Sequence, residues 1–130
     1  MEDSLGTRGP DGPLLVIVDG ANVVGSRPDG WWRDRRGAAE RLRDRLARQG
    51  LPGRPAAVEI VLVVEGAARG VESVPGVRVE AAPGSGDDRI VELAAEQPGR
   101  PRLVVTADRE LRRRVGELGA GVTGPRAVLG

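Results

Sequence analysis

One stretch of the chain, LLVIVDGANVVG at residues 14–25, constrains the fold more than any other. Its first five residues, Leu14 to Val18, are all apolar, and the run is too short to cross a membrane. Such a run, rich in β-branched side chains, is typical of a strand buried on both faces of a parallel sheet. Asp19 follows directly, at the end of the strand where open parallel sheets bind ligands. The stretch therefore predicts an α/β protein with a carboxylate in a functional position.

The rest of the chain alternates between strand and helix patterns. Further strands are expected at residues 57–64, 77–81 (at a sheet edge) and 102–107, with a short last strand at residue 122 and residues 127–129. Helices are expected at residues 31–49, 87–97 and 108–118. This alternation predicts a single domain over residues 13–130, with helices on both faces of a parallel sheet. Residues 1–12, rich in Gly, Pro and Asp, predict a disordered N-terminal tail.

Composition removes several kinds of chemistry. The chain has no cysteine, which excludes disulfides, thiol nucleophiles and zinc-thiolate sites. It also has no histidine, which excludes Ser-His-Asp and Cys-His catalysis and all imidazole metal sites. An enzyme built from this chain is left with carboxylate chemistry, supported by Ser, Thr, Asn and Arg.

Charge and hydropathy indicate a cytoplasmic protein that does not associate with membranes. No apolar run approaches the roughly 18 residues that a transmembrane helix needs, and the polar start of the chain lacks the apolar region of a signal peptide. The net charge is only +1, so long-range attraction to nucleic acid would be weak. Any basic surface must therefore be local.

Acidic residues stand where predicted strands end. Asp19, Glu65 and Asp108 each follow a strand, and the pair Asp87-Asp88 opens the helix after the third one. At about 100° per residue, Asp87 falls on the apolar face of that helix, whereas Asp88 points to the solvent side. We therefore expect Asp87 to be the ligand and Asp88 to support it. A simpler alternative is that several of these residues cap helices or form turns, although a capping Asp keeps its second oxygen for a ligand.

The convergence of these acids predicts a bound cation. Two carboxylates about 4 Å apart repel each other by about 4 kcal/mol at an effective dielectric constant of about 20. A fold that gathers several of them at one sheet edge therefore needs a compensating positive charge. With no His or Cys available, an all-oxygen site selects Mg²⁺ or Mn²⁺. Such ions activate water and orient phosphodiesters, so no protein nucleophile is required.

The predicted helix at residues 31–49 is the one candidate for a basic surface. Ala38, Ala39, Leu42 and Leu46 form its apolar stripe, and seven arginines lie among its remaining residues. The alternative is an ordinary solvated helix, because acidic residues are interspersed with the arginines. Trp31 and Trp32 are the only aromatic residues of the chain. We expect one of them to pack over the sheet and the other to serve in the core, as a lid or in base stacking.

Three motifs in order carry a resemblance to a known family. DGAN at residues 19–22, GDDRIVELA at 86–94 and VVTADREL at 104–111 resemble the NYN branch of the PIN-like superfamily, close to bacterial YacP-like proteins. The resemblance extends from Leu14 to Val122. It implies a Rossmann-like three-layer α/β/α sandwich, with a mostly parallel sheet of four to five strands in the order 3-2-1-4-5, and a metal-dependent ribonuclease site.

The resemblance also implies roles for individual residues. Asp19, Asp87 and Asp108 correspond to the metal-binding acids, Asn22 to the polar residue after the first acid, and Thr106 to the hydroxyl of a T-x-D motif. Glu65 stands where relatives commonly have Asp. Its longer side chain leaves direct ligation and binding through a water equally open.

The leading hypothesis is a Mg²⁺- or Mn²⁺-dependent endoribonuclease. In it Asp19, Asp87 and Asp108 hold the metal, Glu65 orients a water, and Asn22 and Thr106 position the phosphate. RNA phosphates would be bound by the arginines of the predicted helix, namely Arg33, Arg36, Arg41, Arg45 and Arg48. The alternatives are a nucleoside triphosphate pyrophosphohydrolase and a non-catalytic RNA-binding module. RNA is the expected partner, and a homo-oligomer or an RNA-processing protein partner is left open.

Overall fold

The computed structural model describes residues 13–53 and 58–130. They form five strands: β1 (Leu14–Asp19), β2 (Val58–Val64), β3 (Val77–Ala81), β4 (Arg102–Val105) and β5 (Gly121–Thr123). The α-helices are α2 (Gly20–Gly25), α3 (Arg35–Gln49), α4 (Gly86–Glu96), α5 (Arg109–Gly116) and α6 (Arg126–Leu129). Two short 3₁₀ turns, η1 (Trp31–Arg33) and η2 (Gly66–Ala68), complete the elements. The tail expected at residues 1–12 lies outside the described residues.

All five strands are parallel and follow the order β3-β2-β1-β4-β5. This is the predicted order, with β3 at an edge and β1 in the centre. Asp19 pairs in register with Val63, and Val18 pairs with Val105. The carboxyl ends of β1, β2 and β4 therefore lie close together along one edge of the sheet.

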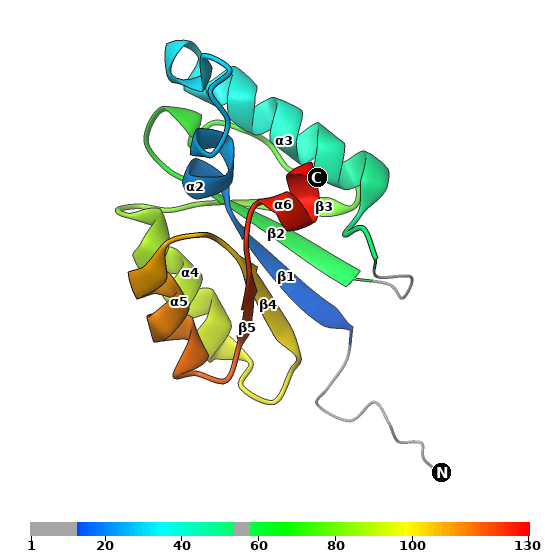
Figure 1. Ribbon diagram of the computed structural model, residues 1–130, viewed down its shortest axis with the longest axis vertical. Coiled ribbons are helices and arrows are strands. Elements are labelled where there is room, and N and C mark those ends of the chain that lie inside the picture. The colour runs from blue at the N-terminus through cyan, green and yellow to red at the C-terminus, as the bar shows by residue number, and fades with distance from the viewer. Residues whose placement is uncertain (1–12, 54–57) are drawn as a thin grey trace.

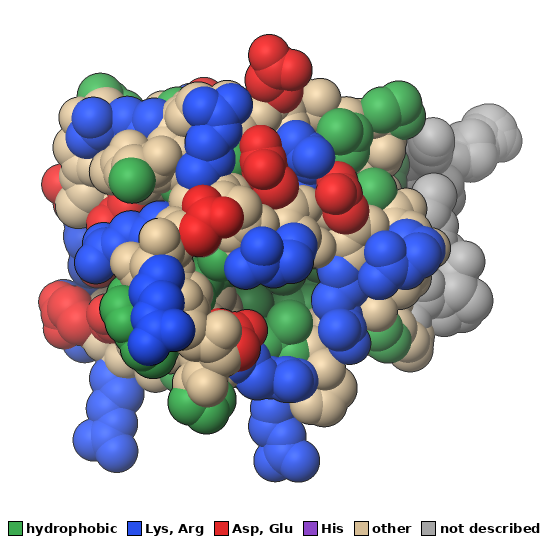
Figure 2. All heavy atoms as spheres, turned by 90° about the horizontal axis from the view of Figure 1, so that it is seen from above, with side chains coloured by type: hydrophobic (Ala, Val, Ile, Leu, Met, Phe, Trp, Pro, Cys, Tyr) green, Lys and Arg blue, Asp and Glu red, His purple; other side chains and the backbone are tan. Residues whose placement is uncertain are grey.

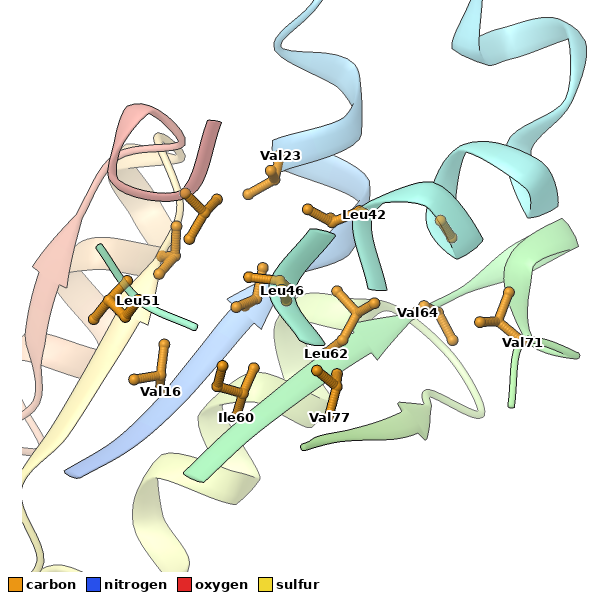
Figure 3. Packing of buried hydrophobic residues seen from close by; sticks show 14 of the residues in the cluster. Val16, Val23, Leu42, Leu46, Leu51, Ile60, Leu62, Val64, Val71 and Val77 are labelled. Carbon is orange, nitrogen blue, oxygen red and sulfur yellow. The ribbon is translucent and has the colours of Figure 1, made fainter. Parts of the chain in front are cut away.

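Helices cover both faces of the sheet and make it the middle layer of an α/β/α sandwich. Helices α2, α3 and α6 lie on one side, and α4 and α5 on the other (Figure 1). Alternate residues of β1 point to opposite faces, as they do in any strand. Val16 and Val18 thus share one core cluster with Leu42 and Leu46 of α3, part of which is shown in Figure 3, whereas Ile17 belongs to the cluster on the other face. Each face of the sheet has its own apolar core.

Apart from shifts of one or two residues at element ends, such as β4 ending at Val105 rather than at residue 107, the described residues differ from the predicted elements in three places. The residues after Asp19 form the helix α2 rather than an open bend. The helix predicted from residue 31 begins instead at Arg35, because the Asp34 side chain accepts a hydrogen bond from Gly37 N at 2.9 Å and caps it. Residues 127–129, expected in a last strand, belong to α6. The predicted stripe of α3, from Ala38 to Leu46, is buried.

Helix length gives no sign of a membrane span. Within residues 13–53 and 58–130, every helix is too short or too polar to cross a lipid bilayer.

A candidate acidic site at the carboxyl edge of the sheet

Four acidic residues gather at the carboxyl edge of the sheet, and we call Asp19, Glu65, Asp87 and Asp108 the acidic edge. Asp19 ends β1, Glu65 follows β2, and Asp108 follows β4 at the start of α5. Asp87 lies in the first turn of α4. The negative charges of Asp87 and Glu65 raise the pKa of Asp19, and those of Asp108 and Glu65 raise the pKa of Asp87. These four positions, far apart in the sequence, thus form one electrostatic cluster.

Asp19 is the most buried member of the acidic edge, with 5% of its surface exposed. Its Oδ1 accepts a hydrogen bond from Asn22 N at 3.3 Å, and its Oδ2 accepts one from Thr106 Oγ1 at 2.9 Å. Burial raises the pKa of its carboxyl from 3.8 to about 6; the two hydrogen bonds oppose this, and the charges of Asp87 and Glu65 add to it. The ionised form of Asp19 is therefore costly until a positive charge compensates it.

Asp87 is half-buried, and its pKa is also raised. Burial is the largest cause, followed by the negative charges of Asp108 and Glu65, while Arg114 opposes the shift. Asp88 next to it is exposed, and its Oδ1 accepts a hydrogen bond from Arg114 Nη2 at 3.1 Å. The helical geometry of residues 87 and 88 is as predicted, with Asp87 turned inward and Asp88 outward.

Thr106 joins the ends of β1 and β4. Its hydroxyl donates to Asp19 and accepts a hydrogen bond from Asp108 N at 3.1 Å. Nearby, the side-chain oxygen of Asn22 accepts a hydrogen bond from Ala107 N at 2.8 Å. Thr106 therefore connects the end of β1, and Asn22 connects α2, to the segment that carries Asp108.

Glu65 is held by the start of α4. Its Oε1 accepts a hydrogen bond from Gly86 N at 2.6 Å, one of the amides that a helix start leaves without an intrahelical partner. The two groups meet because residue 86 has no side chain: a Cβ there would lie 2.5 Å from the same oxygen. This contact orients Glu65 toward the first turn that carries Asp87.

The capping alternative is correct for two of the acids. Asp19 caps α2, and Asp108 caps α5 through a hydrogen bond from Leu111 N to its Oδ1 at 2.9 Å. Ser85, rather than an acid, caps α4 by accepting from Asp88 N at 3.2 Å. Capping and ligation are compatible for Asp108, because only one of its two oxygens serves the cap.

The chemistry of the acidic edge suits a hard cation, but its side chains do not form a ready-made chelate. All four acids offer oxygen, the donor that Mg²⁺ and Mn²⁺ prefer. Within the described ranges, no group of three or more acidic side chains lies close enough together to hold one ion. Mg²⁺ usually keeps several waters and binds through one or two carboxylates plus substrate phosphates. The residues present fit that mode of binding rather than a cage made only of protein.

Four of the five arginines predicted to bind RNA lie in α3. Arg36 and Arg45 make contacts within the fold: Arg36 donates to Gly70 O at 3.3 Å, and Arg45 donates to the carbonyls of Val128 and Leu129, each at 3.0 Å. Arg41, Arg45 and Arg48 line a cavity of about 460 Å³ between α2 and α3. Figure 2, which looks onto this side of the molecule, shows basic side chains interspersed with acidic ones around a hollow.

Arg33 and the tryptophans lie at η1. The Arg33 guanidinium is 5.8 Å from the centre of the Trp32 ring, and Arg35 is 5.3 Å from that of Trp31. Trp32 is 52% exposed and Trp31 is half-buried. Neither is part of the buried core, contrary to the expectation that one would pack over the sheet.

Two arginines near the site were not identified from the sequence. Arg112 Nε donates to the carbonyl of Thr106 at 2.8 Å and fixes the backbone after β4. Arg114 pairs with Asp88 and lowers the pKa of Asp87. The sequence carries no local signal for the Arg114 contact, because α5 and α4 are brought together only by the packing of the fold.

The fold and the acidic edge define a Rossmann-like α/β protein with a polar site beyond the carboxyl ends of its strands. No family model matches the chain, and no curated protein matches it. Among solved structures it is similar to Rae1 (YacP) from Bacillus subtilis, in the W164L mutant. The TM-score is 0.63 at 21% sequence identity, over 88% of this chain and 71% of Rae1. This similarity establishes the YacP-like fold.

Proposed function

We propose that this protein is a Mg²⁺- or Mn²⁺-dependent endoribonuclease that uses the acidic edge. The observation that carries the proposal is the buried Asp19, whose pKa is raised to about 6 and whose ionisation the charges of Asp87 and Glu65 oppose further. A cluster of carboxylates that disfavour one another's charge is costly unless it binds a cation. Strongly perturbed acids in such a place are typical of functional sites.

Among Asp19, Asp87 and Asp108, one or two carboxylates would contact the ion directly and the others would reach it through waters, with the RNA phosphate completing its surroundings. The bound ion would lower the pKa of a water, orient the phosphodiester and stabilise the leaving oxygen. Glu65, fixed by Gly86 N, would orient the attacking water, and Asp88 would keep Arg114 in place beside Asp87.

Asn22 and Thr106 would position the reacting groups. The Asn22 side-chain oxygen already accepts from Ala107 N, so its NH₂ group is the part that would donate to a phosphate oxygen. The Thr106 hydroxyl donates to Asp19 and thereby sets the direction of that carboxylate. Both residues would maintain the geometry of the site before RNA binds.

RNA would be bound mainly through its phosphates. Arg41 and Arg48 are the arginines of α3 best placed for this, because Arg36 and Arg45 also make contacts within the fold. Phosphate contacts confer little sequence preference, and binding that depends on them falls as salt rises. RNA is accordingly the partner we propose.

The family resemblance supports this function independently of the geometry. The motifs that hold Asp19, Asp87 and Asp108 resemble YacP-like members of the NYN branch, and that resemblance implies a metal-dependent ribonuclease. Rae1 (YacP), whose fold the chain shares, carries the same family name.

The test is cleavage of a fluorescently labelled single-stranded RNA with Mg²⁺, Mn²⁺ or EDTA. We expect cleavage only with a divalent ion, and a loss of at least a hundredfold in Asp19→Asn and Asp108→Asn. Glu96→Gln is the matched control, because Glu96 is exposed at the far end of α4. Mn²⁺ affinity measured by calorimetry should fall in the same two variants. Cleavage that survives both substitutions would refute the assignment.

A non-catalytic RNA-binding module is the second candidate. It is favoured by the finding that no three acids within the described ranges are arranged around one ion. Salt-sensitive RNA binding without metal-stimulated cleavage would support it. Free nucleoside triphosphates belong in the same assay, since their turnover in place of RNA would indicate a pyrophosphohydrolase.

A further inference from the structure

The two tryptophans of the chain form one exposed cluster with two arginines. The rings of Trp31 and Trp32 meet edge to face, with centroids 6.0 Å apart and planes at 87°. Arg35 lies against Trp31 and Arg33 against Trp32. Trp32 is one of two large apolar side chains exposed within the described ranges. An aromatic ring beside an arginine can stack on an unpaired base, and of the two rings it is Trp31 that also lines the cavity described next.

A small cavity joins this cluster to the acidic edge. It has a volume of about 80 Å³ and lies between α2, the start of α3 and the turn after β2. Its lining includes Trp31 and Arg35, the apolar side chains of Val24 and Ala39, and Gly20 and Glu65. Because Glu65 belongs both to the cavity and to the acidic edge, a molecule in the cavity would be next to the proposed reaction site.

Trp31 is held in place as a wall of this cavity. A Cβ added at Gly25 would lie 3.6 Å from Trp31 Cζ2, so the ring packs over the end of α2. Asp34 caps α3 directly after η1, and Arg36 ties the first turn of α3 to Gly70 O. The Trp31 ring is therefore presented by a fixed segment, which lowers the entropy lost when a base stacks on it.

We infer that one base of single-stranded RNA stacks on Trp31 with its edge in this cavity, so that the adjoining phosphate lies over the acidic edge. The inference rests on the proposed function and specifies its substrate class. A volume of about 80 Å³ corresponds to several waters, enough for the edge of a flat ring rather than a whole nucleotide. Bases within a duplex are already stacked and paired, so the site would select unpaired RNA.

The chain permits a direct test, because Trp31 and Trp32 are its only aromatic residues. In Trp32→Leu the fluorescence reports on Trp31 alone, and in Trp31→Leu it reports on Trp32 alone. We expect an unstructured oligoribonucleotide, added in EDTA so that no cleavage occurs, to quench Trp32→Leu strongly and Trp31→Leu at most weakly. A duplex of the same sequence and an abasic strand should not quench Trp31.

Binding is measured in parallel by fluorescence anisotropy of labelled RNA. Trp31→Leu should weaken binding of single strands by about tenfold, and Trp32→Leu, the matched control, by less than threefold. RNA that binds without quenching Trp31 would overturn this inference and leave the proposed function intact. RNA that binds to no form of the protein would overturn both. If Trp31→Leu does not fold, the quenching of Trp32→Leu still decides the question.

Discussion

The Thr106 hydroxyl donates a hydrogen bond to the Asp19 carboxylate at 2.9 Å, although 87 positions separate the two residues in the sequence. Thr106 is fully buried, and its oxygen also accepts from Asp108 N. One hydroxyl thus connects the ends of two central strands and the two acids beside them.

Replacing this hydroxyl should destabilise the fold. Thr106→Val keeps the shape of the side chain but leaves the Asp19 oxygen and the Asp108 amide without their partner. We expect a loss of about 1–3 kcal/mol in the free energy of unfolding, measured in urea. Thr106→Ser keeps the hydroxyl and serves as the control. Equal stability of the Val and Ser variants would contradict this role.

Acidification should first stabilise the protein in the absence of divalent ions. The pKa of Asp19 is about 6 in the fold against an ordinary value of 3.8, because burial disfavours its charge. The folded state therefore binds the proton more tightly, and stability falls as pH rises through that range. Between pH 7 and pH 5 we expect a gain of about 1 kcal/mol, measured by urea unfolding in EDTA. In Asp19→Asn this gain should largely disappear, and a wild-type curve that is flat over the interval would contradict the expectation.

A side chain at position 86 should disturb Glu65. A Cβ there would lie 2.5 Å from Glu65 Oε1, so Gly86→Ala must displace the carboxylate and break its hydrogen bond to the backbone. Because the clash is with the end of a flexible side chain, we expect little change in stability but a severalfold loss of Mn²⁺ affinity in calorimetry. At Gly84 a Cβ meets nothing within 4 Å, which makes Gly84→Ala the control. Unchanged metal affinity in Gly86→Ala would show that Glu65 does not contribute to metal binding.

A side chain at position 20 should push α2 away from the sheet. A Cβ there would lie 2.5 Å from the backbone oxygen of Val63, which cannot move without disturbing β2. We expect Gly20→Ala to cost about 1–3 kcal/mol, measured by thermal and urea unfolding. Gly116→Ala, at the exposed end of α5 with nothing within 4 Å, should instead be neutral or stabilising. Similar losses of stability in the two variants would show that the close approach of Gly20 to Val63 does not matter for stability.

Much of the architecture could be predicted because it depends on local patterns. The apolar run at residues 14–18 and the stripe from Ala38 to Leu46 determine which segments are strands and helices and which faces they bury. The inward direction of Asp87 followed from helical geometry alone. The start of α3 was predicted too early because the helical pattern of the sequence continues through Asp34. In the structure the Asp34 cap begins the helix after that residue. Residues 127–129 were assigned wrongly because three apolar residues are equally compatible with strand and helix.

The sequence by itself determined that strands and helices alternate along the chain and that thiol and imidazole chemistry is excluded. It also determined that an acid lies at or just after the end of β1, β2 and β4. Only the tertiary structure decided which groups meet there. The hydrogen bond from Thr106 to Asp19, the contact of Glu65 with Gly86 N and the use of Arg45 to hold α6 all join distant segments. Hydropathy and helix or strand periodicity act over a few neighbouring residues, whereas a hydrogen bond between side chains requires two positions that only the packed sheet brings within 3 Å or so.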